Sequence, residues 1–260
     1  MRPMVKVAVD AARQAGDMIA RATQRPHEIK VKAKGQDDYV TQIDYAAERI
    51  VLSVLQEAYP KHSFLSEEQG EIIGESTDHQ WVIDPLDGTR NFVRGIPLFA
   101  VSIAKLFRGR VEHAVVYNPM TRDTYTASLG EGAQHNGKRI RVSENPTLDG
   151  TLFSTGLTRV NGNLTAQLAV LADLHKRAHP RQIGVTSLEL ALISSGAIDV
   201  AWHFDCPIWD IAAGALLIRE AGGMVMEPNG GVDYLQSGHI LAGNIKTCRE
   251  MLKILQTHFK

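Results

Sequence analysis

The sequence predicts an α+β fold, because its hydrophobic periodicity changes twice along the 260 residues. Apolar side chains recur at helical spacing in the first twenty or so residues and again around residues 47–55. Short apolar strands separated by turns dominate residues 64–136, and strand and helix patterns alternate after residue 150. We therefore expect one compact domain over residues 1–260, with subdomains of about 1–150 and 151–260.

Two amphipathic helices open the chain. One face of the first helix carries apolar side chains at helical spacing: Val5, Val9, Ala12, Gly16 and Ile19. The second helix is expected to begin near Thr41 or Asp44 and to end before Pro60. A polar loop over residues 34–38 separates the two helices.

The β-rich section follows. Strands are predicted at residues 64–65, 81–83, 99–107, 111–117 and 123–127. Arg108-Gly109 suits a hairpin turn between the third and fourth of these strands, and the segment around Asn136-Gly137 continues the β-rich section.

After residue 150 the predicted helices cover residues 164–176, 188–195, 211–220 and 247–259. Strands are predicted at residues 200–204, 224–226 and 240–242. Gly196 stops the second of these helices and Gly222-Gly223 closes the third, because glycine suits the residue after a helix.

Composition excludes several classes of protein. The 28 basic and 29 acidic residues give a formal net charge of −1, which argues against bulk binding to nucleic acid or an anionic membrane. No apolar run reaches the roughly 18–20 residues of a membrane helix, and charges interrupt the N-terminus where a signal peptide would be apolar. Two cysteines rule out a disulfide framework. We expect a soluble cytoplasmic protein.

Acidic residues gather at the ends of predicted elements. Glu67 and Glu68 follow one strand, Asp84 and Asp87 follow the strand at residues 81–83, and Asp210 stands directly before a helix. Side chains at such ends converge on a crevice. Each group taken alone also fits a plain structural role, as a turn, a solvated loop or a helix cap.

The middle group is the most specific. Pro85 is expected to end the strand and fix a turn, so that Asp84, Asp87 and the Leu86 carbonyl face the same side. Hard oxygen ligands of this kind suit Mg²⁺, which keeps waters for a phosphate substrate. Gly88-Thr89 then offers backbone N–H groups and a hydroxyl to an anion.

Longer motifs resemble the inositol monophosphatase family: residues 67–68, 81–89, 209–214 and 220–223. The resemblance spans nearly the whole chain. It implies a layered αβαβα sandwich of the inositol monophosphatase/fructose-bisphosphatase type and Mg²⁺-dependent hydrolysis of inositol 1-phosphate or a related phosphomonoester. Lithium sensitivity and a homodimer are also implied.

The resemblance assigns roles residue by residue. Glu67, Asp84 and the Leu86 carbonyl would hold one Mg²⁺, and Asp84, Asp87 and Asp210 a second. Thr89, hydrogen-bonded to Asp44, would help Glu67 orient the attacking water. The substrate would contact Asp87, Gly88, Thr89, Gly184, Thr186, His203 and Asp210.

Two positions depart from the family pattern. His203 stands where the family has a glutamate that binds inositol hydroxyls, and histidine supplies no carboxylate. Arg90 replaces a small polar residue and adds positive charge near the phosphate. Sugar phosphates and nucleotides, including the substrates of the nucleotide 3′-phosphatase and fructose-bisphosphatase branches, therefore stay open as alternatives.

A second class of function is also open. Some bacterial relatives act in transcription antitermination and bind RNA polymerase or Nus factors. The basic stretches at residues 108–110 and 138–141 offer contact surfaces for such partners, although both also fit a solvated face.

Overall fold

We analysed a computed structural model of the chain, which describes residues 1–35, 38–157 and 164–259. The helices are α1 (Pro3–Ala22), a 3₁₀ turn η1 (Pro26–Glu28), α2 (Gln42–Ala58), α3 (Thr89–Val93), α4 (Leu164–Leu174), α5 (Thr186–Ser194), α6 (Ile208–Glu220), α7 (Tyr234–Ser237) and α8 (Ile245–His258).

The strands form three sheets. They are β1 (Val31–Gly35), β2 (Asp38–Thr41), β3 (His62–Ser66), β4 (Gly70–Ile72), β5 (Ser76–Asp87), β6 (Ala100–Phe107), β7 (Arg110–Asn118), β8 (Asp123–Ser128), β9 (Gly132–His135), β10 (Lys138–Arg139), β11 (Leu152–Thr155), β12 (His179–Arg181), β13 (Val200–His203), β14 (Met224–Met226) and β15 (Ile240–Gly243). The eight-stranded sheet has the order β10-β9-β8-β7-β6-β5-β3-β4, the five-stranded sheet β12-β11-β13-β15-β14, and β1 pairs with β2.

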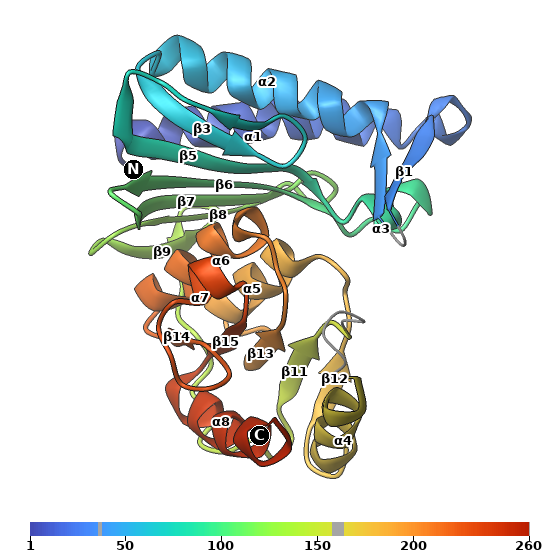
Figure 1. The fold of residues 1–260 in the computed structure, drawn as a ribbon, viewed down its shortest axis with the longest axis vertical. Helices are drawn as coiled ribbons and strands as arrows, with labels where there is room; N and C mark the ends of the chain where they lie inside the picture. The colour runs from blue at the N-terminus through green and yellow to red at the C-terminus, as the bar shows by residue number, and fades with distance from the viewer. Residues whose placement is uncertain (36–37, 158–163, 260) are drawn as a thin grey trace.

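Five layers are stacked along the long axis of the molecule (Figure 1). Helices α1 and α2 cover one face of the eight-stranded sheet, and α5 and α6 cover its other face. Side chains of neighbouring residues in a strand point to opposite faces of the sheet. Val115 packs in the core beneath α1 and α2, and Val116 packs in the core with α6. The sequence prediction of an α+β fold is confirmed.

The five-stranded sheet repeats this arrangement on the other side of α5 and α6. Ala201 faces these two helices, whereas Trp202 faces α4 and α8 in the outermost core. The order of layers is therefore αβαβα, as the family resemblance implied. All strands of the large sheet precede residue 140, and those of the five-stranded sheet begin at Leu152. The division into one domain with two subdomains stays a prediction.

Strand β5 differs from its prediction at Pro85. It was expected to end there, but it continues to Asp87. The pairing with β6 is irregular between Asp84 and Asp87, which pair with Ser102 and Ala100. A bulge of this kind tolerates proline, because the bulged residue needs no partner for a backbone N–H. The irregularity matters because both carboxylates lie on it.

Other differences are local. The polar loop expected over residues 34–38 is wrong at its ends, because β1 extends to Gly35 and β2 begins at Asp38; residues 36–37 lie outside the described residues. Short strands β4 and β12 were not predicted, since they contain few apolar residues, whereas the equally short β14 was predicted from its apolar run. Helix α6 begins at Ile208, three residues earlier than predicted.

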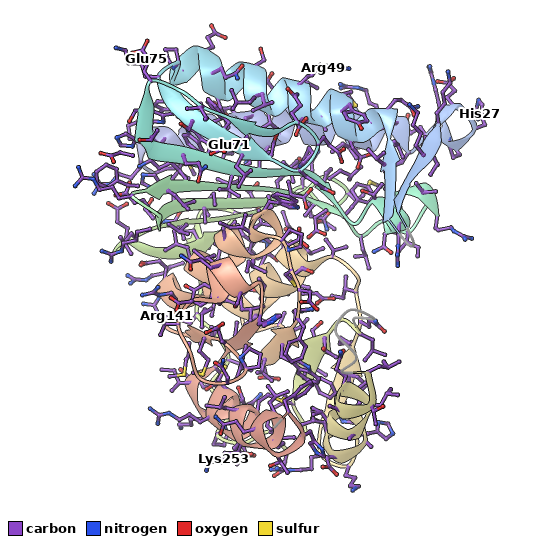
Figure 2. The ribbon with its side chains drawn as sticks, viewed as in Figure 1. His27, Arg49, Glu71, Glu75, Arg141 and Lys253 are labelled. Atoms are coloured by element: carbon purple, nitrogen blue, oxygen red, sulfur yellow. The ribbon has the colours of Figure 1, made fainter. Side chains whose placement is uncertain are left out.

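The surface is charged. Figure 2 shows charged side chains extending outward from the layers, among them Arg49 on α2, Arg141 before β11 and Lys253 on α8. None of the helices in the described ranges is long and apolar enough to span a membrane.

Candidate active site

Four of the predicted acidic residues line one cavity of about 780 Å³: Glu67, Asp84, Asp87 and Asp210. The cavity lies at the end of β5, beside the starts of α5 and α6. Strands β3 and β5 are parallel, with Ser66 beside Ile83, so their carboxyl ends lie at the same edge of the sheet. Glu67 follows β3 and Asp84 follows Ile83, and the Glu67 N–H donates to the Ile83 carbonyl (3.2 Å). This pairing brings the first two acidic groups together.

Asp84 and Asp210 approach the cavity from opposite halves of the chain. The Leu86 N–H donates to Asp84 Oδ1 (2.9 Å) and fixes that carboxylate. Asp210 lies in the first turn of α6, which Ser102 holds to the large sheet by donating to the Trp209 carbonyl (3.0 Å). The two carboxyl groups are hydrogen-bonded to each other, which requires a shared proton when no cation lies between them.

Burial is the main cause that raises the pKa values of these acids. Burial first, and then the charges of Glu67, Asp87 and Asp210, raise the pKa of Asp84 well above its usual range. Burial followed by the charge of Asp87 does the same to the pKa of Asp210. Ionising all of these groups together is costly unless a cation compensates the charge.

Asp87 has its own partner. The Ser187 N–H and hydroxyl both donate to Asp87 Oδ2, at 2.7 and 2.6 Å. Burial raises the pKa of Asp87 to about 6, and the two hydrogen bonds from Ser187 oppose that shift. These two hydrogen bonds hold the start of α5 against the end of β5 at the cavity.

The donor set fits a divalent metal ion. Two buried carboxylates, Asp84 and Asp87, the half-buried Asp210, one further glutamate and Leu86 line one cavity. Among the described residues, no group of three or more Asp, Glu, His or Cys side chains is arranged closely enough to hold a metal ion by itself. Mg²⁺ binds hard oxygen ligands and completes its shell with water and phosphate, so an open set of carboxylate and carbonyl oxygens matches it.

Thr89 links the cavity to a buried acid behind it. The Thr89 hydroxyl lies 2.8 Å from Asp44 Oδ1 and 3.1 Å from the Leu86 carbonyl. Asp44 is 1% exposed, and Thr41 donates to its other oxygen through both N–H (2.8 Å) and hydroxyl (2.6 Å). Burial raises the pKa of Asp44 against these hydrogen bonds.

Two helices that begin beside the cavity suit an anion. Gly88 precedes α3, and Thr186 and Gly184 at the start of α5 also line the cavity. Backbone N–H groups at a helix start carry partial positive charge. Gly88 has φ +93°, and a Cβ there would lie 2.7 Å from Val185 Cγ2, so this position requires glycine.

His203 is not among the residues that line the cavity. It is 5% exposed, and its Nδ1 accepts a hydrogen bond from the Gly156 N–H (3.2 Å). Its Nε2 lies 3.0 Å from Glu189 Oε2. Burial alone would raise the pKa of Glu189, but His203 lowers it below its usual range. The expected contact between His203 and substrate stays a prediction.

Sequence reasoning missed three supporting residues. Glu189 Oε1 accepts the N–H groups of Ile183 (2.8 Å) and Gly184 (3.1 Å), so it shapes the turn before α5. Glu48 Oε1 accepts the N–H groups that follow Glu67, at 3.0 and 3.2 Å. Ser187 holds Asp87. The only available signal was for Glu48, which stands four residues after Asp44 and shares its helix face.

Most of the predicted residues lie together. The cavity lining includes the predicted residues Glu67, Asp84, Leu86, Asp87, Gly88, Thr89, Gly184, Thr186 and Asp210, together with Arg90. Asp44 lies behind Thr89, and His203 behind the turn that Glu189 shapes.

The motifs that carry these residues are shared with known proteins. The sequence profile of the inositol monophosphatase family matches residues 1–258. The chain belongs to the inositol monophosphatase family. A relative from Pseudomonas aeruginosa, named Nus factor SuhB, is 46% identical over 99% of this chain and 97% of its own length.

Solved structures of inositol monophosphatase family proteins have the same fold. The extragenic suppressor protein SuhB of Bartonella henselae superposes with a TM-score of 0.95 at 38% identity, covering 98% of this chain and 99% of that one. An IMPase from Thermotoga maritima gives a TM-score of 0.88 at 32% identity over 99% and 98% of the two chains. These comparisons extend over the whole length of the chain, so the site lies within the matched region.

Proposed function

We propose that this protein is a Mg²⁺-dependent phosphomonoesterase that hydrolyses inositol 1-phosphate or a related small phosphomonoester. The observation that carries the proposal is the convergence of four acidic side chains on one cavity beside two helix starts. Negative groups that need a cation and N–H groups that need an anion are both satisfied by a metal-bound phosphate. Membership of the inositol monophosphatase family supports the same reaction.

Glu67, Asp84 and the Leu86 carbonyl would hold the first Mg²⁺, and Asp84, Asp87 and Asp210 the second. When bound, the metal lowers the pKa of a water molecule and neutralises charge on the phosphoryl group. Ser187 contributes by holding Asp87 Oδ2 with two hydrogen bonds, which leaves Oδ1 to face the cavity.

Thr89 and Glu67 would position the attacking water. The Thr89 hydroxyl donates its proton to Asp44, so the Thr89 oxygen accepts a hydrogen bond from the water. Glu67 accepts the second proton of that water. The N–H groups of Gly88 and Thr89 hold the phosphate oxygens, and no side chain is required as a covalent nucleophile.

The leaving-group end of the cavity would determine specificity. Gly184 and Thr186 line this end, together with Arg90 and Gln182. His203 Nε2 lies 3.0 Å from Glu189 Oε2 behind the turn, and neither residue is part of the cavity lining. This arrangement keeps sugar phosphates and nucleotides as candidate substrates beside inositol 1-phosphate.

Phosphate release from a substrate panel tests the proposal. Inositol 1-phosphate, a hexose phosphate and AMP are compared with and without Mg²⁺, and with added Li⁺, which we expect to inhibit. Asp87→Asn should abolish release, while its circular dichroism spectrum and melting curve show a folded protein. Release that is unchanged by EDTA or by Asp87→Asn would contradict the proposal.

A homodimer would use the exposed edge of the five-stranded sheet at β12. Strand β12 forms one edge of that sheet, and all three of its residues are exposed. Beside it lies a largely apolar cavity of about 700 Å³, whose lining includes Phe153, Leu157 and Leu168. Leu157 and Leu168 are 39% and 49% exposed. Light scattering should give a dimer for the wild type and a monomer for Leu168→Lys; a monomeric wild type would contradict this part.

A second candidate function is a role in transcription antitermination, through contact with RNA polymerase or Nus factors. The observation that favours it is the 46% identity to the relative named Nus factor SuhB. Such a role would not need catalysis. Purified protein and its Asp87→Asn variant should retain a Nus factor or RNA polymerase equally in pull-downs, and retention by neither would contradict this role.

A further inference from the structure

A second concave site lies at the far end of the large sheet. This cavity has a volume of about 400 Å³ and lies at the β6–β7 turn. Strand β6 begins at Ala100, paired with Asp87 of the acidic cavity, and ends at Phe107, paired with Arg110 of the second cavity. The seven residue-to-residue steps from Ala100 to Phe107 span about 23 Å. The two cavities are therefore separate sites.

Three arginines line this second cavity: Arg108, Arg110 and Arg219. Arg108 and Gly109 have φ values of +49° and +76°, the conformation of a tight hairpin turn. Asp78 accepts from both Nε and Nη2 of Arg108 at 3.1 Å, and the Arg108 guanidinium lies 5.1 Å from the centre of the Phe107 ring. Arg108 is thus fixed and its charge is balanced.

Unlike Arg108, Arg110 and Arg219 have no ion-pair partner among the described residues. Among residues 1–35, 38–157 and 164–259, no carboxylate lies within ion-pair distance of either guanidinium. Arg219 Nη1 lies 3.5 Å from the Tyr234 hydroxyl. Arg219 in the last turn of α6 is favoured by the helix dipole, but the same reason does not apply to Arg110 at the start of β7.

Nearby acids are already engaged elsewhere. Glu112 lies 2.5 Å from the buried Lys105 ammonium. Glu220 accepts the N–H groups of Gly130 (2.8 Å) and Gly132 (2.7 Å). None of the residues that line the second cavity is acidic, so the lining carries excess positive charge, even though the whole chain has a formal net charge of −1.

The remaining lining is apolar or neutral. Leu129 and Leu235 supply partly exposed apolar side chains, and Tyr234 and Gln236 supply polar atoms that carry no charge. Tyr234 is only 8% exposed, so its ring is a fixed part of the wall. An inorganic anion would use the guanidinium groups alone, whereas an organic anion would also cover the apolar surface.

We propose that this arginine-lined cavity binds a small organic phosphate, in which the phosphate contacts Arg110 and Arg219 and a ring or short apolar group packs on Leu129 and Leu235. A phosphate has three terminal oxygens and up to two negative charges, so it accepts hydrogen bonds from two guanidinium forks at once. The cavity volume falls in the range of small-molecule sites. This inference does not depend on the proposed phosphatase activity.

Calorimetric titration with AMP in EDTA tests the proposal. EDTA removes the metal ion that is proposed to hold a phosphate in the acidic cavity, and a dependence of AMP binding on Arg110 and Arg219 assigns the binding to the arginine-lined cavity. AMP should bind to the wild type. In the double variant Arg110→Gln/Arg219→Gln, the affinity for AMP should fall by roughly tenfold or more for each arginine removed. Adenosine should bind far more weakly because it lacks the phosphate, and inorganic phosphate more weakly because it lacks the ring.

Matched controls separate specific contact from net charge. Arg49→Gln/Arg141→Gln removes the same two charges from exposed positions outside the cavity, and should bind AMP like the wild type. Asp87→Asn should also leave this binding intact. Melting curves check that every variant is folded. The proposal is overturned if AMP does not bind at about 10 mM, if the Arg110/Arg219 variant binds like the wild type, or if adenosine or inorganic phosphate binds as tightly as AMP.

Discussion

The hydrogen bond between Thr89 and Asp44 should matter more for turnover than for stability. In Thr89→Val the side chain keeps its shape but loses the hydroxyl that lies 2.8 Å from Asp44 Oδ1. Both bonds from Thr41 end on Oδ2, so the change removes the side-chain donor to Oδ1. A lost hydrogen bond to a charged group costs about 1.5–3 kcal/mol, which lowers the melting temperature by about 3–12 °C for a chain of this size.

Turnover should fall much further in the same variant. A water that is no longer oriented for proton transfer loses about 10²–10⁴-fold in rate. Phosphate release at saturating substrate and Mg²⁺ measures kcat, and Thr89→Ser, which keeps the hydroxyl, serves as the control and should stay within about tenfold of the wild type. The reasoning is refuted if Thr89→Val keeps more than a tenth of the wild-type kcat, or if the Ser variant is as impaired as the Val variant.

Further predictions concern stability and metal binding. The raised pKa values of Asp84, Asp87 and Asp210 stabilise the metal-free fold fully below about pH 4, and for Asp87 this contribution is lost as pH rises through about 6. Added Mg²⁺ should therefore raise the melting temperature more at pH 7.5 than at pH 5. Equal increases in melting temperature at the two pH values would contradict this prediction. Gly88→Ala should lower the free energy of unfolding by at least about 1–2 kcal/mol and abolish turnover, because φ is +93° and the new Cβ would lie 2.7 Å from Val185 Cγ2. Calorimetry measures the loss of stability, and phosphate release measures the loss of turnover. Glu48→Ala should raise the Mg²⁺ concentration for half-maximal activity, and Glu48→Gln should restore it, because it keeps an acceptor for two buried N–H groups.

Long elements could be predicted from the sequence because their periodicity is set by burial. Helices α1 and α2 bury one face each against the large sheet, and that face is visible as regular apolar spacing. Strand β12 has three exposed residues and leaves no such pattern. Pro85 misled the prediction of β5, because the effect of proline depends on whether the partner strand needs its N–H, which only the pairing with β6 reveals.

The acidic site was predictable where one motif carries several groups. Asp84, Leu86 and Asp87 lie within four residues on one bulge, so their common cavity could be inferred from spacing. Ser187 and His203 could not be placed in this way. Ser187 meets Asp87 across 100 residues of chain, and the direction of the His203 ring depends on Glu189 and on a backbone N–H from a different strand end.

Direct measurement of Mg²⁺ binding by isothermal titration calorimetry tests the central claim most directly. The wild type should bind Mg²⁺ near pH 7 with release of protons, because the raised pKa values of Asp84 and Asp210 leave protons to displace. Asp84→Asn should lose that binding while remaining folded, since this carboxylate is proposed to contact both ions. Binding by Asp84→Asn that equals the wild type, or no binding by the wild type at millimolar Mg²⁺, would contradict the account.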